Sequence, residues 1–165
     1  MNKKIAPKQK TTVNYLDKVF DAWHFCDNAY LKLVRQWGIS LNTVWVLEYL
    51  DKHPEGAEPA VLADETHMLR QAITVVLNDL EGRGYLSRAA NADDRRRKNI
   101  QLTPEGTAFA KKVLAAISAA EQDAAAALST EELRRLCEYS QRFSREFTRC
   151  VNEIILCKNE PETMK

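Results

Sequence analysis

The sequence lacks the features that define membrane, secreted and zinc-binding proteins. No apolar run approaches the ~18–20 residues that a membrane span requires, and the lysine-rich start lacks the apolar segment of a signal peptide. The four cysteines lie far apart, and no histidine joins them at the spacing of metal ligands. We therefore expect a cytoplasmic protein with no membrane span, no metal site, no disulfide framework and no cofactor.

Glycine and proline are also scarce, at five residues each among 165. Alanine, leucine, glutamate, arginine and lysine, which favour helices, are abundant, so the chain is predicted to be mainly α-helical. Apolar residues at 45% and charged residues at 28% are typical of a globular domain, and the length suits one domain or two small ones.

Apolar residues recur at three- and four-residue steps along the first half of the chain. They predict a long helix over residues 13–37, ended by Gly38, and a second helix capped by Ser40. Two short helices follow, over residues 59–65 and 68–82, and the first has a proline at its first position. The two short helices and the turn between them indicate a helix-turn-helix.

The helical spacing of apolar residues ends at Gly84. Residues 85–87 and 100–102 resemble strands, and the polar segment 91–98 between them predicts a β-hairpin with a long tip. Four consecutive cations lie in this tip: Arg95, Arg96, Arg97 and Lys98. The order helix, turn, helix, hairpin is that of a winged helix-turn-helix, which binds DNA. The alternative is that the tip is an ordinary solvated basic loop.

Two further helices are predicted after the hairpin. Thr103 and Pro104 form an N-cap and first turn for an alanine-rich helix that reaches about residue 128. Ser129 and Glu132 form a capping box for a last helix. That helix has a long apolar face: Leu133, Leu136, Phe143, Phe147, Cys150, Val151, Ile154 and Ile155. Such a face needs a partner, which is either a second copy of the chain or another part of the same monomer.

Three short runs around the predicted hairpin resemble the wing of MarR-type transcriptional regulators. They are LNDLEGRGYLSR at residues 77–88, DDRRRK at 93–98 and LTPEG at 102–106, and they match the family pattern L-E-x-x-G-Y/L-x-x-R, D-R-R and L-T-x-x-G. The resemblance extends over roughly residues 16–155. It implies a mainly α fold with a small β-hairpin wing, and a helical dimerisation region formed by the N- and C-terminal helices.

This resemblance also implies a domain organisation and a function. Residues 1–38 would be an arm and the first dimerisation helix, 39–103 the winged helix-turn-helix, and 104–165 the remaining dimerisation helices and tail. The function implied is that of a homodimeric regulator, usually a repressor, which binds a palindromic operator in double-stranded DNA. A small-molecule effector would release it from the operator.

The same resemblance assigns residues of the predicted wing to DNA contacts. Asp94 and Arg96 match the family's D-x-R pair, in which the carboxylate orients the arginine toward the minor groove. Arg95 and Arg97 are then expected to contact phosphates.

The recognition helix aligns at about residues 70–78. Arg70, Gln71 and Thr74 are expected on its outward early turns, within reach of base edges. The sequence departs from the family at two positions: Leu69 stands where a capping serine is frequent, and Val75 where a cation is frequent.

Aromatic residues of the first two predicted helices form a candidate effector site. Trp23, His24 and Tyr30 lie on the first helix, and Trp45 and Tyr49 on the second. In the MarR family the cleft between the dimerisation region and the DNA-binding domain often binds aromatic acids and related effectors. The alternative is that these aromatic side chains pack in the core.

Two other functions compete with an effector-released repressor. One branch of the family senses organic hydroperoxides through a cysteine near its N-terminal helix, and Cys26 lies in that region. We favour a packing role for Cys26, because His24 is two residues away and points to another side of the helix. The other alternative is a helical protein-interaction module that has lost DNA binding. No enzyme is expected, since the sequence has no phosphate-binding glycine loop and no nucleophile elbow.

Overall fold

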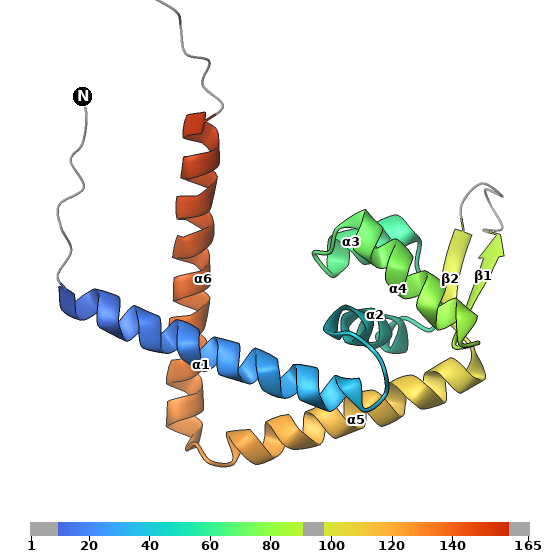
Figure 1. The fold of residues 1–165 in the computed structure, drawn as a ribbon, viewed down its shortest axis with the longest axis horizontal. Helices are drawn as coiled ribbons and strands as arrows, with labels where there is room; N and C mark the ends of the chain where they lie inside the picture. Colours follow the sequence, from blue (N-terminus) through green and yellow to red (C-terminus); the bar gives the residue numbers. More distant parts are fainter. Residues whose placement is uncertain (1–9, 91–97, 159–165) are drawn as a thin grey trace, which may run out of the picture. The chain divides into compact units, whose positions relative to one another are not determined.

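The computed structural model describes residues 10–90 and 98–158. Its elements are α1 (Lys10–Arg35), α2 (Leu41–Lys52), α3 (Pro59–Glu65), α4 (Arg70–Gly82), β1 (Leu86–Ala90), β2 (Lys98–Leu102), α5 (Pro104–Ala125) and α6 (Thr130–Lys158) (Figure 1). The prediction of a mainly helical chain with one small hairpin is confirmed. The chain divides into two units, Met1–Ser118 and Ala119–Lys165, and each is described by itself.

Caps predicted from the sequence set several helix boundaries. The Ser40 hydroxyl accepts the backbone N–H of Thr43 at 3.2 Å and starts α2. Gly38 follows α1 with a φ of +62°, which is the left-handed conformation that glycine adopts at a helix end. The short helix α3 covers the predicted range.

Other predicted boundaries were wrong by a few residues. We expected α4 to begin at residue 68, but it begins at Arg70 because His67 has a φ of +54° and the Met68 N–H bonds back to the Ala63 carbonyl oxygen at 3.0 Å. The helix α5 ends at Ala125 rather than near residue 128, since Leu128 N–H bonds to the carbonyl oxygen only three residues earlier. Such hydrogen bonds, between residues three positions apart, are those of a 3₁₀ turn, which commonly ends an α-helix.

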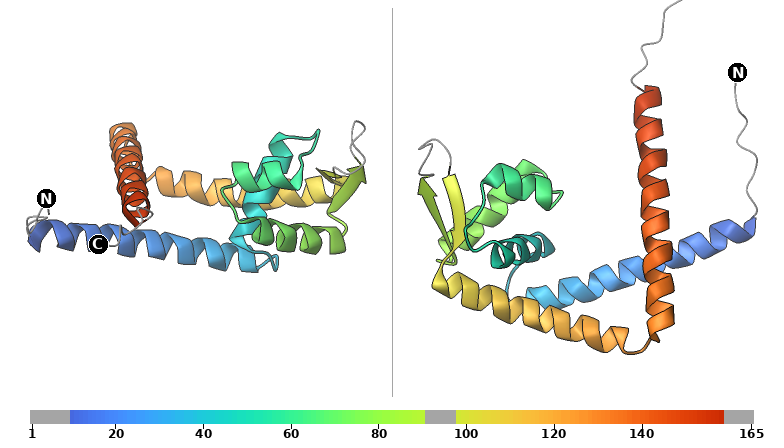
Figure 2. Two further views of the ribbon diagram at one scale, coloured as in Figure 1. Left: turned by 90° about the horizontal axis from the view of Figure 1, so that it is seen from above. Right: turned by 180° about the vertical axis from the view of Figure 1, so that it is seen from behind.

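The core of the first unit is formed mainly by α2, α3, α4, β2 and α5, and Val34 of α1 is also fully buried in it. Fully buried side chains come from each of these elements: Leu47, Leu50, Leu62, Ile73, Leu77, Leu80, Ile100 and Val113. In both views of Figure 2, α4 leads from α3 to the hairpin. Because α4 buries one face in this core, its opposite face is directed outward.

The hairpin is anchored to both neighbouring segments of the chain. Strands β1 and β2 are antiparallel, with Leu86 opposite Leu102. Ala57, in the loop before α3, forms an isolated antiparallel bridge with Ile100 of β2. Thr103 donates its hydroxyl to the Gly84 carbonyl oxygen at 2.8 Å and accepts the Gly106 N–H at 3.0 Å. This cap fixes the start of α5 directly beneath the hairpin.

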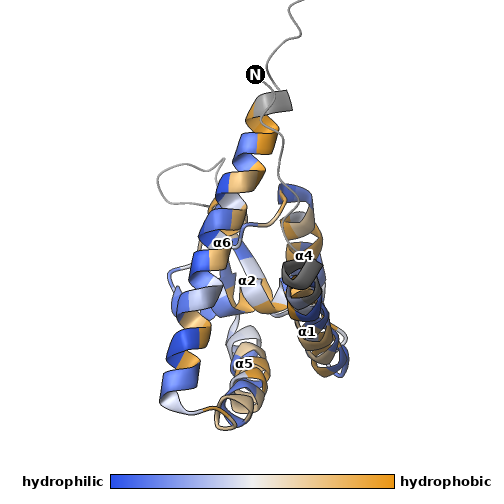
Figure 3. Cartoon of the chain, turned by 90° about the vertical axis from the view of Figure 1, so that its left-hand side faces the viewer, coloured by the Kyte–Doolittle hydropathy of each residue, from blue (hydrophilic) through white to orange (hydrophobic). Residues whose placement is uncertain are grey.

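The second unit consists mainly of α6, an amphipathic helix. Figure 3 shows hydrophobic and hydrophilic residues alternating along it. Six large apolar side chains of α6 are exposed in the monomer: Leu136, Tyr139, Phe147, Ile154, Ile155 and Leu156. Four of these six side chains, Leu136, Phe147, Ile154 and Ile155, belong to the apolar face predicted from the sequence.

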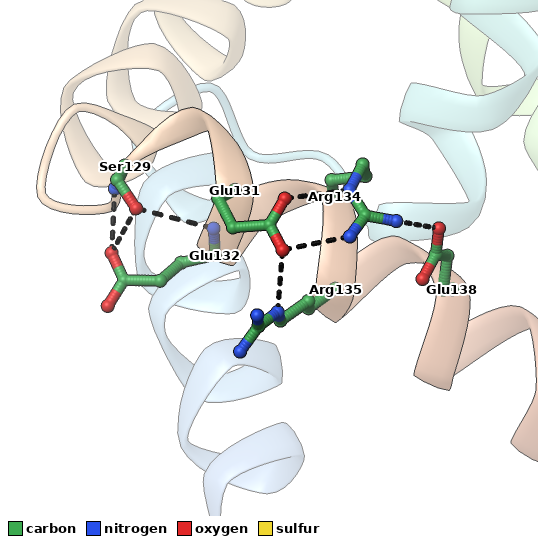
Figure 4. A network of polar contacts seen from close by, with 6 residues as sticks. All are labelled: Ser129, Glu131, Glu132, Arg134, Arg135 and Glu138. Carbon is green, nitrogen blue, oxygen red and sulfur yellow. Dashed lines mark hydrogen bonds and ion pairs between the residues drawn. The ribbon is translucent and has the colours of Figure 1, made fainter.

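A polar network starts α6 (Figure 4). Glu132 accepts the backbone N–H and the hydroxyl of Ser129 at 2.8 and 2.7 Å, and Ser129 in turn accepts the Glu132 N–H at 3.3 Å. This is the predicted capping box. The Ser129 hydroxyl, followed by the Ser129 N–H, holds the pKa of Glu132 below its ordinary value.

Because the folded state lowers this pKa, ionised Glu132 stabilises α6 at neutral pH and loses that effect as the pH falls through the folded pKa. Wild type is therefore expected to be more helical than Glu132→Gln at pH 7, and equally helical at an acidic pH that fully protonates Glu132. Circular dichroism at 222 nm during thermal melts at both pH values measures this. A difference that persists in acid would contradict the ionic role of Glu132.

Candidate nucleic-acid interface

The outward face of α4 carries the residues that the sequence assigned to base contacts. Burial of Ile73, Val76, Leu77 and Leu80 places Gln71, Thr74, Val75 and Asn78 on the opposite side, one helical turn apart, where all four are exposed. Arg70 is exposed at the first position of the helix. We call Gln71, Thr74, Val75 and Asn78 the outward face of α4.

Hydrogen bonds restrict two side chains of this face. Thr74 donates its hydroxyl to the Arg70 carbonyl oxygen at 2.9 Å, so its oxygen remains an acceptor. The Asn78 side-chain oxygen accepts from Arg88 of β1 at 2.6 Å. Gln71 lies at the N-terminal end of the outward face and Val75 in its middle, and Asn78 connects that face to the hairpin.

Two arginines hold α4 in place, and sequence reasoning missed both. Besides Asn78, Arg88 contacts Glu81, whose carboxylate oxygen lies 3.0 Å from Arg88 Nε. Arg83 donates to the carbonyl oxygens of Trp37 and Gly38 at 3.1 and 2.6 Å. Both arginines precede the basic tip in the sequence, but their guanidinium groups bind acceptors within the fold. Glu81 and Arg88 both belong to the L-E-x-x-G-Y/L-x-x-R pattern, which was the available signal.

The predicted wing contacts Asp94, Arg95, Arg96 and Arg97 lie outside the described residues. The structure describes the base of the wing, where exposed Lys98 begins β2 opposite Ala90. The segment 91–97 connects Ala90, the last residue of β1, to Lys98 in the sequence.

An open groove of about 520 Å³ lies between α2 and the turn that links α3 to α4. Its lining residues are Trp45, Glu48, Tyr49, Lys52, Glu65, Thr66 and His67. It contains two of the five aromatic residues predicted for an effector site, Trp45 and Tyr49. The other three lie on α1 and do not line it: Trp23 packs edge-to-face on Phe20, Tyr30 packs against the core, and His24 is exposed.

The charges of this groove are paired or acidic. Lys52 Nζ lies 2.6 Å from Glu48 Oε1, so these two charges form an ion pair. The other carboxylate in the lining belongs to Glu65, and His67 lines the groove as well. Trp45 is 47% exposed, and the Tyr49 ring stacks on His53 with centroids 4.3 Å apart. Two aromatic surfaces with a surplus carboxylate suit an uncharged or cationic planar molecule better than an aromatic acid.

The structure does not bury Cys26 in the monomer, where a packing role was expected. Cys26, Cys137 and Cys150 are free, and all three are exposed. In the parts of the chain that the structure describes, no group of three side chains is arranged to hold a metal ion. Among the described helices, none is both long enough and apolar enough to cross a membrane.

Comparison with known sequences identifies the segment that carries this site. Residues 37–97, from the end of α1 through α4 to the wing, match the model of the MarR family. A Thauera aromatica protein, named as a candidate transcriptional regulatory protein for the hcr operon, is 28% identical over 109 residues. That alignment covers 66% of this chain and 65% of the relative, so the chain spans just under two thirds of the relative's length.

Solved structures share the fold over most of the chain. The MarR family transcription regulator SP03579 is 22% identical with a TM-score of 0.74, over 87% of this chain and 99% of that one. The Staphylococcus aureus MepR–DNA complex is 22% identical with a TM-score of 0.69, over 81% of this chain and 96% of that one. NMB1585, a MarR family regulator from Neisseria meningitidis, is 19% identical with a TM-score of 0.67, over 84% of this chain and 97% of that one. At these identities the likeness concerns the fold.

Proposed function

We propose that the chain, whose residues 37–97 match the model of the MarR family, is a winged-helix transcription regulator that represses transcription by holding an inverted-repeat DNA operator as a homodimer. The observation that carries the proposal is the outward face of α4, which is exposed, fixed by a packed inner face and attached to the hairpin through Arg88. Such a helix fits the major groove while the wing lies beside it. The proposed place of action is the cytoplasm.

Each proposed DNA contact follows from the chemistry of its side chain. The Gln71 amide can donate and accept toward adenine, and Arg70 at the first turn of α4 suits guanine or a phosphate. Lys98 at the base of the wing suits a phosphate. Arg95, Arg96 and Arg97, with Asp94 orienting Arg96, remain sequence-based proposals for the minor groove and its phosphates.

A second copy of the chain is the proposed partner of the exposed apolar residues on α6. The side chains of Phe147 and Ile154 are more than half exposed in the monomer, and α1 exposes Tyr15 and Phe25 as well. Exposed apolar side chains repeated along one helix face are typical of an interface. Two DNA-reading heads one helical turn apart, ~34 Å, then match an inverted repeat.

The groove at α2 is the proposed effector site. It includes Thr66 and His67 of the turn that precedes α4 and sets its position, so a bound molecule can change the angle at which α4 meets DNA. From its lining we propose an uncharged or cationic aromatic effector. This differs from the aromatic acids that the family resemblance suggested.

DNA binding is tested by fluorescence anisotropy with labelled DNA from upstream of the protein's own gene, over a salt series. We expect tight, salt-sensitive binding that Arg96→Ala and Gln71→Ala each weaken by about 1–3 kcal/mol. Only Arg96→Ala should also reduce the salt slope, because it removes a cation. The control is Lys111→Ala, which removes an exposed cation of α5 outside the proposed interface. Equal binding by all four proteins would contradict the proposed contacts.

One observation favours a redox-controlled alternative. The Cys26 thiol is exposed on α1 and therefore accessible to peroxide. If peroxide rather than an aromatic molecule is the signal, it should release the protein from DNA, and Cys26→Ser should abolish that release while leaving DNA binding unchanged.

A further inference from the structure

Val75 occupies the middle of the outward face of α4 and is 69% exposed. Gln71 lies one turn before it and Asn78 about one turn after it. The inner face of the helix already supplies four buried apolar side chains, so Val75 adds nothing to the core. A β-branched residue at an exposed helix position also has a lower helix propensity than alanine.

The neighbours of Val75 leave one apolar contact site on an otherwise polar surface. Thr74 keeps an acceptor oxygen, Gln71 keeps its amide, and Asn78 is engaged by Arg88. A surface of this kind, placed in the major groove, contacts base edges in a row. The position facing Val75 must be one that loses no hydrogen bond when water is excluded, because an unpaired polar group would be costly.

We propose that Val75 reads a thymine in each operator half-site by contact with its 5-methyl group. In the major groove the thymine methyl is the one apolar group that a base pair presents, whereas the other edges carry donors and acceptors. This inference rests on the proposed DNA binding and adds to it the base that one residue selects. The observation that supports this inference is the exposure of Val75 in the structure. From the sequence alone, Val75 was only a departure from the family pattern.

The test uses duplexes in which one atom group is removed from the DNA. A binding site for the full chain is first recovered by selection from a random-sequence duplex library. Each thymine of the recovered site is then replaced in turn, symmetrically in both half-sites, by deoxyuridine, which lacks only the methyl group. Affinities are measured by fluorescence anisotropy for wild type, Val75→Ala and Val61→Ala.

We expect one thymine position at which deoxyuridine weakens wild-type binding by about fourfold for each half-site, the effect of one buried methyl group. Val75→Ala should bind both duplexes equally, and its folding should be intact because alanine favours the helix at this exposed position. Val61→Ala removes the same atoms from an exposed valine of α3 and should discriminate as wild type does.

The outcomes separate this inference from the proposed function. Wild-type binding that is equal for thymine and uracil at every position would overturn the role of Val75 while leaving DNA binding established. Discrimination that survives in Val75→Ala would overturn it as well, and a loss of discrimination in Leu69→Ala would then assign the methyl contact to the start of α4. Failure to recover any site would contradict both the inference and the proposed function.

Discussion

The Gly106→Ala variant is expected to be less stable than wild type by about 3 kcal/mol, at the upper end of the range for overpacked positions. A methyl group at Gly106 would lie 1.8 Å from the carbonyl oxygen of Tyr85 and 2.7 Å from its carbonyl carbon. Both are backbone atoms, so no side-chain rotation relieves the clash. Either α5 or the hairpin must move, and the Thr103 cap and the stacking of Tyr85 on Phe109 would be disturbed with them.

Gly82→Ala is the matched control for this prediction. Apart from the adjoining residues and the helix's own backbone, no described atom lies within 4 Å of the position that a Cβ at Gly82 would take, and the residue ends α4 without a positive φ. This variant should be as stable as wild type or up to about 1 kcal/mol more stable. Urea unfolding followed by circular dichroism measures both. Equal stability of the two variants would show that Tyr85 and Gly106 do not approach each other in the folded protein.

The Phe147→Glu variant is expected to lose DNA affinity by at least about 100-fold, because it should prevent dimerisation and with it the joint binding of two half-sites. Phe147 is 56% exposed in the monomer and stacks on Phe143 of the same helix face. A carboxylate placed in an apolar interface has no partner there and must be desolvated. Sedimentation velocity should show a dimer for wild type and a monomer for the variant.

Asn152→Glu adds the same charge to an exposed position of α6 away from its apolar face, and it should remain a dimer with unchanged DNA affinity. The winged-helix core lies in the other unit, so the variants should keep its helicity. A Phe147→Glu protein that stays dimeric would show that another surface forms the dimer. A wild-type monomer that binds DNA tightly would remove the dimer from the proposal altogether.

Local signals in the sequence predicted much of the fold. Ser40, Gly38 and Thr103 act through hydrogen bonds or backbone conformations that involve only nearby residues, so their effects follow from the sequence. The outward position of Arg70, Gln71 and Thr74 on α4 was also predicted, and all three are exposed.

Long-range contacts could not be predicted in the same way. Arg83 bonds to Trp37 and Gly38, which lie more than forty positions earlier, and nothing in the local sequence indicates that its charge is used there. The start of α4 was misplaced because the left-handed backbone of His67 depends on the packing of the turn. The groove likewise lies between α2 and this turn, which are separate in the sequence. The sequence alone therefore could not show that Trp45 and Tyr49 line the groove while the three predicted residues of α1 do not.

The measurement that tests DNA recognition by a dimer most directly is selection of binding sites by the full chain from a random duplex library, followed by sequencing. We predict an enriched inverted repeat whose half-site centres lie about one helical turn, ~10 base pairs, apart. The same complex should contain two chains for each duplex. A folded, dimeric protein that enriches no sequence would contradict the proposed function and would favour a protein-interaction module on the same fold.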